Sequence, residues 1–156
     1  MSPQPLWAPW RLTYVEHADE LDRCIFCDPE PDLLVHDGDA ALVVMNKFPY
    51  SSGHVLVAPK RHSRDFGSLT DAEALEIHRL ASHSIDALRS EYRPDGFNLG
   101  WNIGRVAGAG IEDHVHLHVV PRWNGDTSFM PVLGDAKVLP EHLLETARRL
   151  RASFAR

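Results

Sequence analysis

Hydrophobic and polar residues alternate most regularly over residues 113–122, where three histidines are separated by apolar residues. A period of two is typical of a β-strand, because successive side chains of a strand point to opposite faces. The polar face of this strand would carry His114, His116 and His118. The opposite face would pack on a core through Val115, Leu117 and Val119.

Apolar, partly β-branched runs predict the rest of a sheet. Residues 33–36 and 40–45 flank the turn sequence Asp-Gly-Asp and predict a β-hairpin. A third strand is predicted over residues 54–59, where it ends in proline, and a fourth over residues 96–102. With the histidine strand, these runs predict five strands.

Two helices are predicted by apolar residues at helical spacing. Thr70 and Glu73 have the spacing of a capping box, and they predict the start of a helix over residues 71–92. Pro140 is predicted to start a second, amphipathic helix, whose apolar positions are Leu143, Leu144, Ala147, Leu150 and Phe154. Hairpins joined by one long helical crossover indicate an α+β fold. We expect a mainly antiparallel five-stranded sheet with one long helix and a C-terminal helix.

Length and composition fit one ordinary globular domain, since the 156 residues are 44% hydrophobic and 24% charged. We expect a single domain over residues 1–156, with an N-terminal packing segment (1–23), a core (24–122) and a C-terminal extension (123–156) that holds the last helix. The formal net charge of −6 argues against bulk attraction to a nucleic acid polymer or a membrane surface. A local cluster could still bind a polyphosphate.

The N-terminus has neither the basic nor the apolar region of a signal peptide, and no apolar run reaches membrane-spanning length. We therefore expect a cytoplasmic protein. Trp7 and Trp10 lie in an aromatic, proline-interrupted opening, which is rare in disordered tails. They are expected to hold this segment against its own domain or against a neighbouring subunit.

The three histidines favour a functional site. A single histidine on a half-exposed strand could simply be its polar residue. Three in register are costly to bury unless each ring nitrogen finds a partner. Such a set could bind a metal, attack an electrophile or hold a phosphate.

Cys24 and Cys27 form a C-x-x-C pair, which is typical of either a metal knuckle or a redox pair. The redox form usually opens a helix, whereas the Asp-Pro that follows Cys27 argues against one. A knuckle needs two further ligands, for which His62 and the histidine strand supply candidates. Because zinc accepts mixed cysteine and histidine tetrahedra, we favour a structural zinc site over bare thiols.

A glycine-rich loop over residues 104–110 leads into the histidine strand. Glycines let backbone N–H groups approach an anion closely, and Arg105 adds positive charge. A glycine-rich loop alone is weak evidence for phosphate binding, but its position directly before three histidines strengthens it.

These motifs together resemble the histidine triad (HIT) superfamily of nucleotide hydrolases and transferases. The resemblance covers residues 24–122 and rests on the three histidines, on Gly53-His54 with Asn46 before it, on Cys24 and Cys27, on Pro59-Lys-x-His62, and on Asn102 with the glycine loop. The ends of the chain, residues 6–11, 121–127 and 138–140, are similar to a bacterial and actinobacterial branch of diadenosine tetraphosphate phosphorylases or hydrolases.

The resemblance implies a role for each matching residue. His116 would be the nucleophile, which attacks the α-phosphorus of a nucleoside polyphosphate and forms a nucleotidyl-histidine. His118 and N–H groups of the loop, at Gly108 and Gly110, would hold the nonbridging phosphate oxygens. The remaining positions would be His54 beside the triad, Asn102 near the phosphates, Asn46 at the ribose, and Val44 and Leu56 at the base. Val44 and Leu56 could equally be plain core.

The resemblance also implies the zinc ligands and the assembly. His114 would join Cys24, Cys27 and His62 in a Cys2His2 zinc site that orders the strand and does not activate water. No organic cofactor is expected. Members of the family look dimeric, with the long helix and a strand at the interface, so a homodimer or larger assembly is expected. The implied substrate is a purine nucleotide or a dinucleoside polyphosphate.

The segment before the histidines departs from the family. Many hydrolase-type members carry Gly-Gln-Ser or similar there, and phosphorylase-like members often carry Gly-Ser, where this chain has Ala109, Gly110 and Ile111. The acceptor that resolves the intermediate therefore stays open. Water would make the protein a hydrolase, and inorganic phosphate would make it a phosphorylase.

Three alternatives are kept. The chain could hydrolyse nucleoside phosphoramidates or nucleotides generally, or it could bind nucleotides without turnover. It could also be a catalytic-zinc hydrolase with His114, His116, His118 and Glu112 or Asp113 as ligands. That last hypothesis leaves the cysteines, His54 and the glycine loop unexplained.

Overall fold

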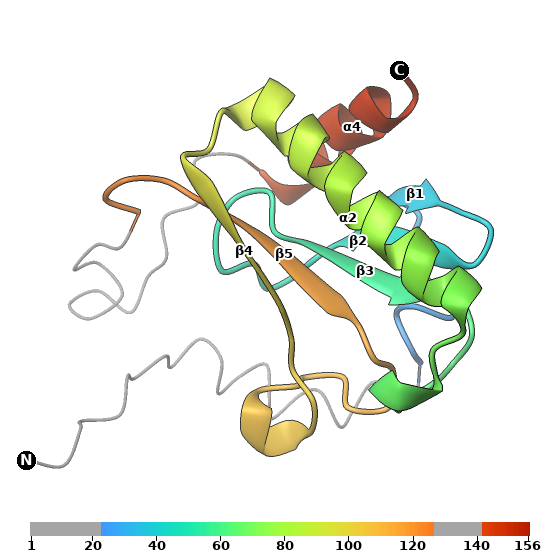
Figure 1. Cartoon of the computed structure of the whole chain (residues 1–156). Coiled ribbons are helices and arrows are strands. Elements are labelled where there is room, and N and C mark those ends of the chain that lie inside the picture. The colour runs from blue at the N-terminus through green and yellow to red at the C-terminus, as the bar shows by residue number, and fades with distance from the viewer. Residues whose placement is uncertain (1–22, 127–141) are drawn as a thin grey trace, which may run out of the picture.

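The computed structural model describes residues 23–126 and 142–156, and within them five strands form one antiparallel sheet (Figure 1). The strands run in the order β1-β2-β3-β5-β4. Their bounds are β1 Leu34–Asp37, β2 Ala41–Met45, β3 Val55–Pro59, β4 Gly96–Trp101 and β5 Leu117–Arg122. Two α-helices are described, α2 Asp71–Tyr92 and α4 Leu143–Phe154, with short 3-10 turns at Phe66–Ser68 and Arg105–Ala107. The α+β expectation with a five-stranded sheet is confirmed.

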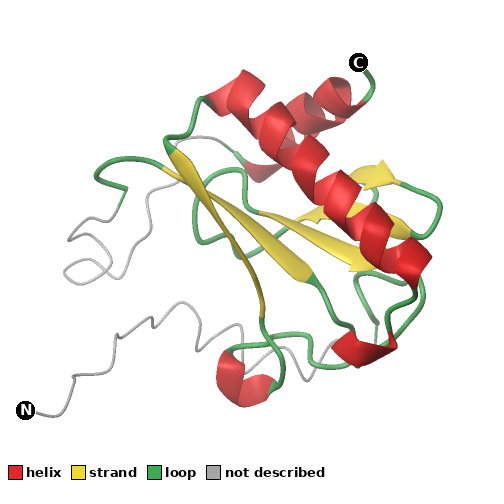
Figure 2. Ribbon diagram, in the orientation of Figure 1, coloured by secondary structure: helices red, strands yellow, loops and turns green. Residues whose placement is uncertain are grey.

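The helices cover one face of the sheet, as Figures 1 and 2 show for α2. Every second residue of a strand points to this face, and the apolar ones form the main core with residues of α2 and α4. Its most buried members from the strands are Ala41, Val43, Val55, Val57 and Val119. The opposite face carries a smaller apolar cluster, which consists of Phe26, Leu42, Val44, Leu56 and Ala58.

β5 is the last strand in the sequence but lies inside the sheet, between β3 and β4. The register pairs His118 with Leu56 on one side and with Gly100 on the other. His118 therefore shares the face opposite the helices with Val44 and Leu56. This topology places His118 inside the sheet, between β3 and β4.

Several boundaries differ from the predicted ones. β5 begins at Leu117, so His114 and His116 precede the strand, because the Val115 N–H donates to the Ser63 carbonyl at 2.7 Å and leaves the sheet ladder. The C-terminal helix begins at Leu143 after an N-cap at His142. Pro140, Trp7 and Trp10 lie outside the described residues. None of the described helices is both long and apolar enough to cross a membrane.

The capping box of α2 is confirmed and is tied to the end of β3. Thr70 Oγ1 accepts from the Glu73 N–H, and the Glu73 carboxylate accepts from the Thr70 N–H at 2.9 Å. The same carboxylate receives two hydrogen bonds from Arg61, at 2.9 and 2.8 Å. The Arg61 guanidinium and the Thr70 N–H lower the pKa of the buried Glu73 to about 2.

This ion pair predicts a defined acid dependence of stability. Because the pKa of folded Glu73 lies below its ordinary value of 4.5, its charge stabilises the fold above pH 4.5, and that contribution is lost as the pH falls towards 2. In urea unfolding, Glu73→Gln should lower the free energy of unfolding at neutral pH, and its difference from wild type should shrink through this range. Asp86→Asn, in an exposed pair of the same helix, is the control. A difference for Glu73→Gln that does not change with pH would contradict this assignment.

Candidate active site and metal centre

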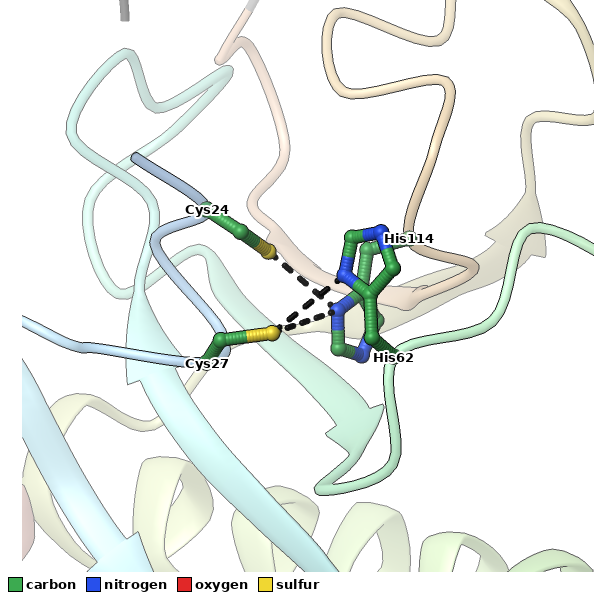
Figure 3. A group of neighbouring side chains, drawn as sticks. All are labelled: Cys24, Cys27, His62 and His114. Atoms are coloured by element: carbon green, nitrogen blue, oxygen red, sulfur yellow. Dashed lines mark hydrogen bonds between the residues drawn. The ribbon is translucent and has the colours of Figure 1, made fainter. Parts of the chain in front are cut away.

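The metal-ligating residues expected from the sequence come together in one cluster, which Figure 3 shows. Cys24 Sγ lies 3.2 Å from His114 Nδ1, and Cys27 Sγ lies 3.3 Å from His62 Nδ1 and 3.7 Å from His114 Nδ1. The four potential ligand atoms all lie within 4.8 Å of one another. The cysteines come from the segment before β1, His62 from the loop after β3, and His114 from the segment before β5.

The backbone sets the tautomer of His114 for metal binding. Its Nε2 lies 2.7 Å from the Pro59 carbonyl oxygen, which can only accept a hydrogen bond. Nε2 therefore carries the proton, and the lone pair of Nδ1 points at the cysteines. A second hydrogen bond of this kind is the usual way in which a protein orients a histidine ligand.

The donor set fits zinc. Ligand distances of about 2.3 Å for sulfur and about 2.0–2.1 Å for nitrogen put ligand atoms of a zinc tetrahedron roughly 3.3–3.8 Å apart. The observed sulfur–nitrogen contacts of 3.2 to 3.7 Å match this spacing. Burial and the neighbouring Cys24 raise the pKa of Cys27 to about 11, so a bound cation would be needed to keep the Cys27 sulfur as a thiolate at neutral pH.

His116 is held in the tautomer that a nucleophile requires. Its Nδ1 lies 2.7 Å from the carbonyl oxygen of His114, so Nδ1 carries the proton and Nε2 carries the lone pair. The ring is buried, and burial lowers its pKa, which keeps it neutral at neutral pH. Phe26, whose ring centroid is 4.9 Å away, packs against it. The His114 carbonyl is thus the partner that holds His116 in this tautomer.

His54 and His118 form a hydrogen-bonded pair beside His116. His54 Nε2 lies 3.0 Å from His118 Nδ1, and the His118 ring lies 5.0 Å from the His116 ring. His54 is fully buried, and Tyr50 stacks on it at 4.8 Å. Asn46 lies against the same ring, with its amide nitrogen 3.3 Å from His54 Nδ1.

The glycine-rich loop adjoins His118 through Asn102. The Asn102 amide nitrogen lies 3.5 Å from His118 Nε2 and 3.4 Å from the Gly108 carbonyl. Gly108 has a left-handed conformation, and its N–H donates to the Arg105 carbonyl at 2.9 Å. The Gly108 N–H is therefore used inside the loop.

The ligands of the catalytic-zinc hypothesis are not brought together. Over the described ranges, Cys24, Cys27, His62 and His114 form the one close group of potential metal ligands. Four protein donors leave such a tetrahedron closed to water. Glu112 is paired instead with Arg64 at 3.2 Å.

The comparisons with known proteins agree with this geometry. The HIT domain family matches residues 29–125. The chain belongs to the HIT family. It is 36% identical to the AP-4-A phosphorylase of Mycobacterium tuberculosis over 98% of this chain and 85% of that protein.

Solved HIT structures share the fold. A zinc-bound histidine triad family protein from Mycobacterium smegmatis aligns with a TM-score of 0.67 at 28% identity, over 85% of this chain and 93% of that one. A diadenosine triphosphate hydrolase from Plasmodium falciparum aligns with a TM-score of 0.66 at 18% identity, over 81% and 78% of the two chains. Because the identity to the Plasmodium falciparum protein is only 18%, that similarity shows the fold alone.

Sequence reasoning missed two residues of this HIT site. Phe26 packs on both His114 and His116 from between the two cysteines, and Tyr50 contacts His54 and His118. Only the position of Phe26 inside the C-x-x-C motif could have signalled a role. Tyr50 lies in a loop without periodicity, so its contacts depend on tertiary structure.

The cluster predicts that this HIT protein binds one tetrahedral metal ion per chain. Cys24→Ser and His62→Ala should lose the ion, as measured by elemental analysis and by the absorption of Co²⁺ bound to thiolates. Removal of the ion by a chelator should lower the melting temperature, because the ion joins three separate segments. His78→Ala, at an exposed position of α2, should keep the ion. Full metal content in Cys24→Ser would contradict the assignment.

Proposed function

We propose that this protein transfers a nucleotidyl group from a dinucleoside polyphosphate of the diadenosine tetraphosphate type to inorganic phosphate, through a covalent intermediate on His116. The observation that carries the proposal is the 2.7 Å hydrogen bond from His116 Nδ1 to the His114 carbonyl, which aims the Nε2 lone pair. Similarity to an AP-4-A phosphorylase over 98% of the chain supports the substrate class.

The first step forms a P–N bond and breaks a P–O bond. His116 Nε2 attacks the α-phosphorus, and the bridging oxygen leaves with the electron pair as part of a nucleoside polyphosphate. In the second step an oxygen of inorganic phosphate attacks the same phosphorus, the P–N bond breaks, and a nucleoside diphosphate is released. A neutral imidazole suits both steps, because it is nucleophilic when it attacks, becomes cationic in the intermediate, and leaves again as a neutral ring when the P–N bond breaks.

The neighbouring residues would bind the substrate around His116. His118, Asn102 and the Gly110 N–H would face the nonbridging phosphate oxygens, where hydrogen-bond donors stabilise developing charge. Asn46 would lie towards the ribose. Val44 and Leu56, on the same sheet face as His118, would form the floor near the base.

We propose zinc as the ion of the Cys24, Cys27, His62 and His114 cluster. When bound there it would supply a structural cross-link between segments and no catalysis, since all four ligands come from the chain. The backbone of His114 would then be held in place, and with it the acceptor of the His116 hydrogen bond.

Inorganic phosphate is favoured over water as the acceptor because of the AP-4-A phosphorylase relative. Hydrolysis of dinucleoside polyphosphates or of nucleoside phosphoramidates would use the same His116 intermediate, so the acceptor is decided by experiment.

Mass spectrometry after brief mixing with diadenosine tetraphosphate tests the proposal. We expect an adenylyl adduct on His116 that is released as ADP when phosphate is present. His116→Ala and His116→Gly should lose the adduct and reduce turnover by about 10³-fold or more, because the covalent route is removed. His78→Ala should behave as wild type.

Two results would revise the proposal. Release as AMP whether or not phosphate is present would make the enzyme a hydrolase. Turnover without an adduct, retained by His116→Ala and abolished by a chelator, would overturn the nucleophile assignment.

We also propose a homodimer formed through the exposed edge of the sheet. Among the strands that the structure describes, β4 lies at an edge, and its Leu99 is 46% exposed; Phe66, whose ring packs on Trp101 of β4, is 50% exposed. An unpaired strand edge beside apolar side chains is suited to pairing with a second copy.

Light scattering tests this assembly. Leu99→Lys should convert the dimer to monomer, because it puts a charge into the paired edge. Leu144→Lys is the matched control, since Leu144 is similarly exposed, at 44%, but lies on α4. A monomeric wild type, or dissociation only by the α4 variant, would refute the proposed interface.

A further inference from the structure

The side chain of Asn46 has a defined orientation. Its amide oxygen accepts a hydrogen bond from the Phe48 N–H at 2.9 Å, so the amide nitrogen must point the other way. That nitrogen lies 3.3 Å from His54 Nδ1 and 3.4 Å from His54 Nε2. Nearly equal distances to both ring nitrogens put the N–H group over the flat side of the imidazole, where it opposes a positive charge on the ring.

The protonation of His54 is set from the protein backbone. The Tyr50 N–H donates to His54 Nδ1 at 3.0 Å, and an N–H can only donate, so Nδ1 carries a lone pair. The proton of the neutral ring is therefore on Nε2. The ring cannot turn to another arrangement, because it is fully buried and stacked on Tyr50.

This assignment passes to His118. His54 Nε2–H points at His118 Nδ1 at 3.0 Å, so His118 Nδ1 must accept, and the proton of neutral His118 is on Nε2. Each step follows from the one before it, because the donor of each short contact must meet an acceptor. The Asn102 amide nitrogen lies 3.5 Å from His118 Nε2, at the outer limit of a hydrogen bond, so the shorter 3.0 Å contact with His54 decides the tautomer. This series of hydrogen bonds starts at the Tyr50 backbone N–H, which has no alternative protonation state.

We propose that Asn46 and Tyr50 are positioning residues that fix, through His54, the His118 tautomer that presents an Nε2–H donor to the substrate phosphate. This inference rests on the proposed nucleotidyl transfer. A lone pair at the same nitrogen would repel the phosphoryl oxygens, whereas an N–H stabilises the charge that develops on them. Asn46 thus acts on the reaction through His54 and His118, in addition to any contact with the ribose.

Asn46→Asp separates the positioning role from ribose binding. The aspartate keeps an oxygen for the Phe48 N–H, so the local turn is preserved. Its second oxygen replaces the N–H over the His54 ring, where a negative charge favours a second proton on the imidazole. A ribose contact alone tolerates the change, because a carboxylate accepts hydrogen bonds from ribose hydroxyls.

The test combines nitrogen-15 NMR of the histidine rings with steady-state kinetics. In the free wild-type protein we expect protonated Nε2 and unprotonated Nδ1 on both His54 and His118. In Asn46→Asp we expect a proton on His54 Nδ1 and a kcat that falls by about 10- to 100-fold, the usual effect of removing an orienting partner, with little change in KM. Asn124→Asp adds the same charge at an exposed turn and is the control.

The outcomes separate this inference from the proposed function. A protonated Nδ1 on wild-type His118, or unchanged His54 protonation and kcat in Asn46→Asp, overturns the positioning role even if the His116 adduct forms. A raised KM with unchanged kcat in Asn46→Asp also overturns it, in favour of a purely ribose-binding role. If no His116 adduct forms while the wild-type tautomers are as expected, the fault lies in the proposed function.

Discussion

The hydrogen bond between the His114 carbonyl and His116 Nδ1 is the interaction on which the site depends. His114 takes part in two arrangements at once: its ring lies in the Cys2His2 cluster and its backbone oxygen orients the neighbouring catalytic candidate. A shift of the His114 backbone would therefore disturb both the cluster and the tautomer of His116. In the proposed mechanism, a metal ion bound in this cluster would therefore influence His116 without having an open coordination position.

The burial of several imidazoles is possible because each has a specified partner. His114 bonds to Pro59, His116 to the His114 carbonyl, and His54 to both the Tyr50 N–H and His118. A buried polar ring without such partners would destabilise the fold. Because β5 is hydrogen-bonded to a strand on each side, it holds His118 at a fixed distance from its partners, as a preorganised site requires.

The proposed function requires an acidic chain to bind a polyanion. With a net charge of −6, the protein has no general attraction for phosphates. Neutral imidazoles, an amide and loop N–H groups instead offer directed donors, which discriminate by geometry more than by charge. The exposed Arg64 and Arg105 are both within 4 Å of Glu112, which reduces their net charge at this end of the site.

The fold class, the long capped helix, the ligand cluster and the family were all predictable from the residues alone. The strands and the helix depend on local spacing, a period of two and the Thr70–Glu73 box respectively, whereas the ligand cluster was expected from the C-x-x-C motif together with the family resemblance. Local spacing can be read from the sequence without knowing how the chain folds.

The start of β5, the ring nitrogens that face hydrogen-bond partners, and the contacts of Tyr50 depend on the folded structure. These depend on partners distant in the sequence, such as Ser63 for Val115, Pro59 for His114 and His54 for His118. A hydrogen bond between remote segments has no periodic signal, since it is set by how strands and loops pack. The chemistry of the site was therefore predictable from residue types, but its proton arrangement was decided by the packing of the folded chain.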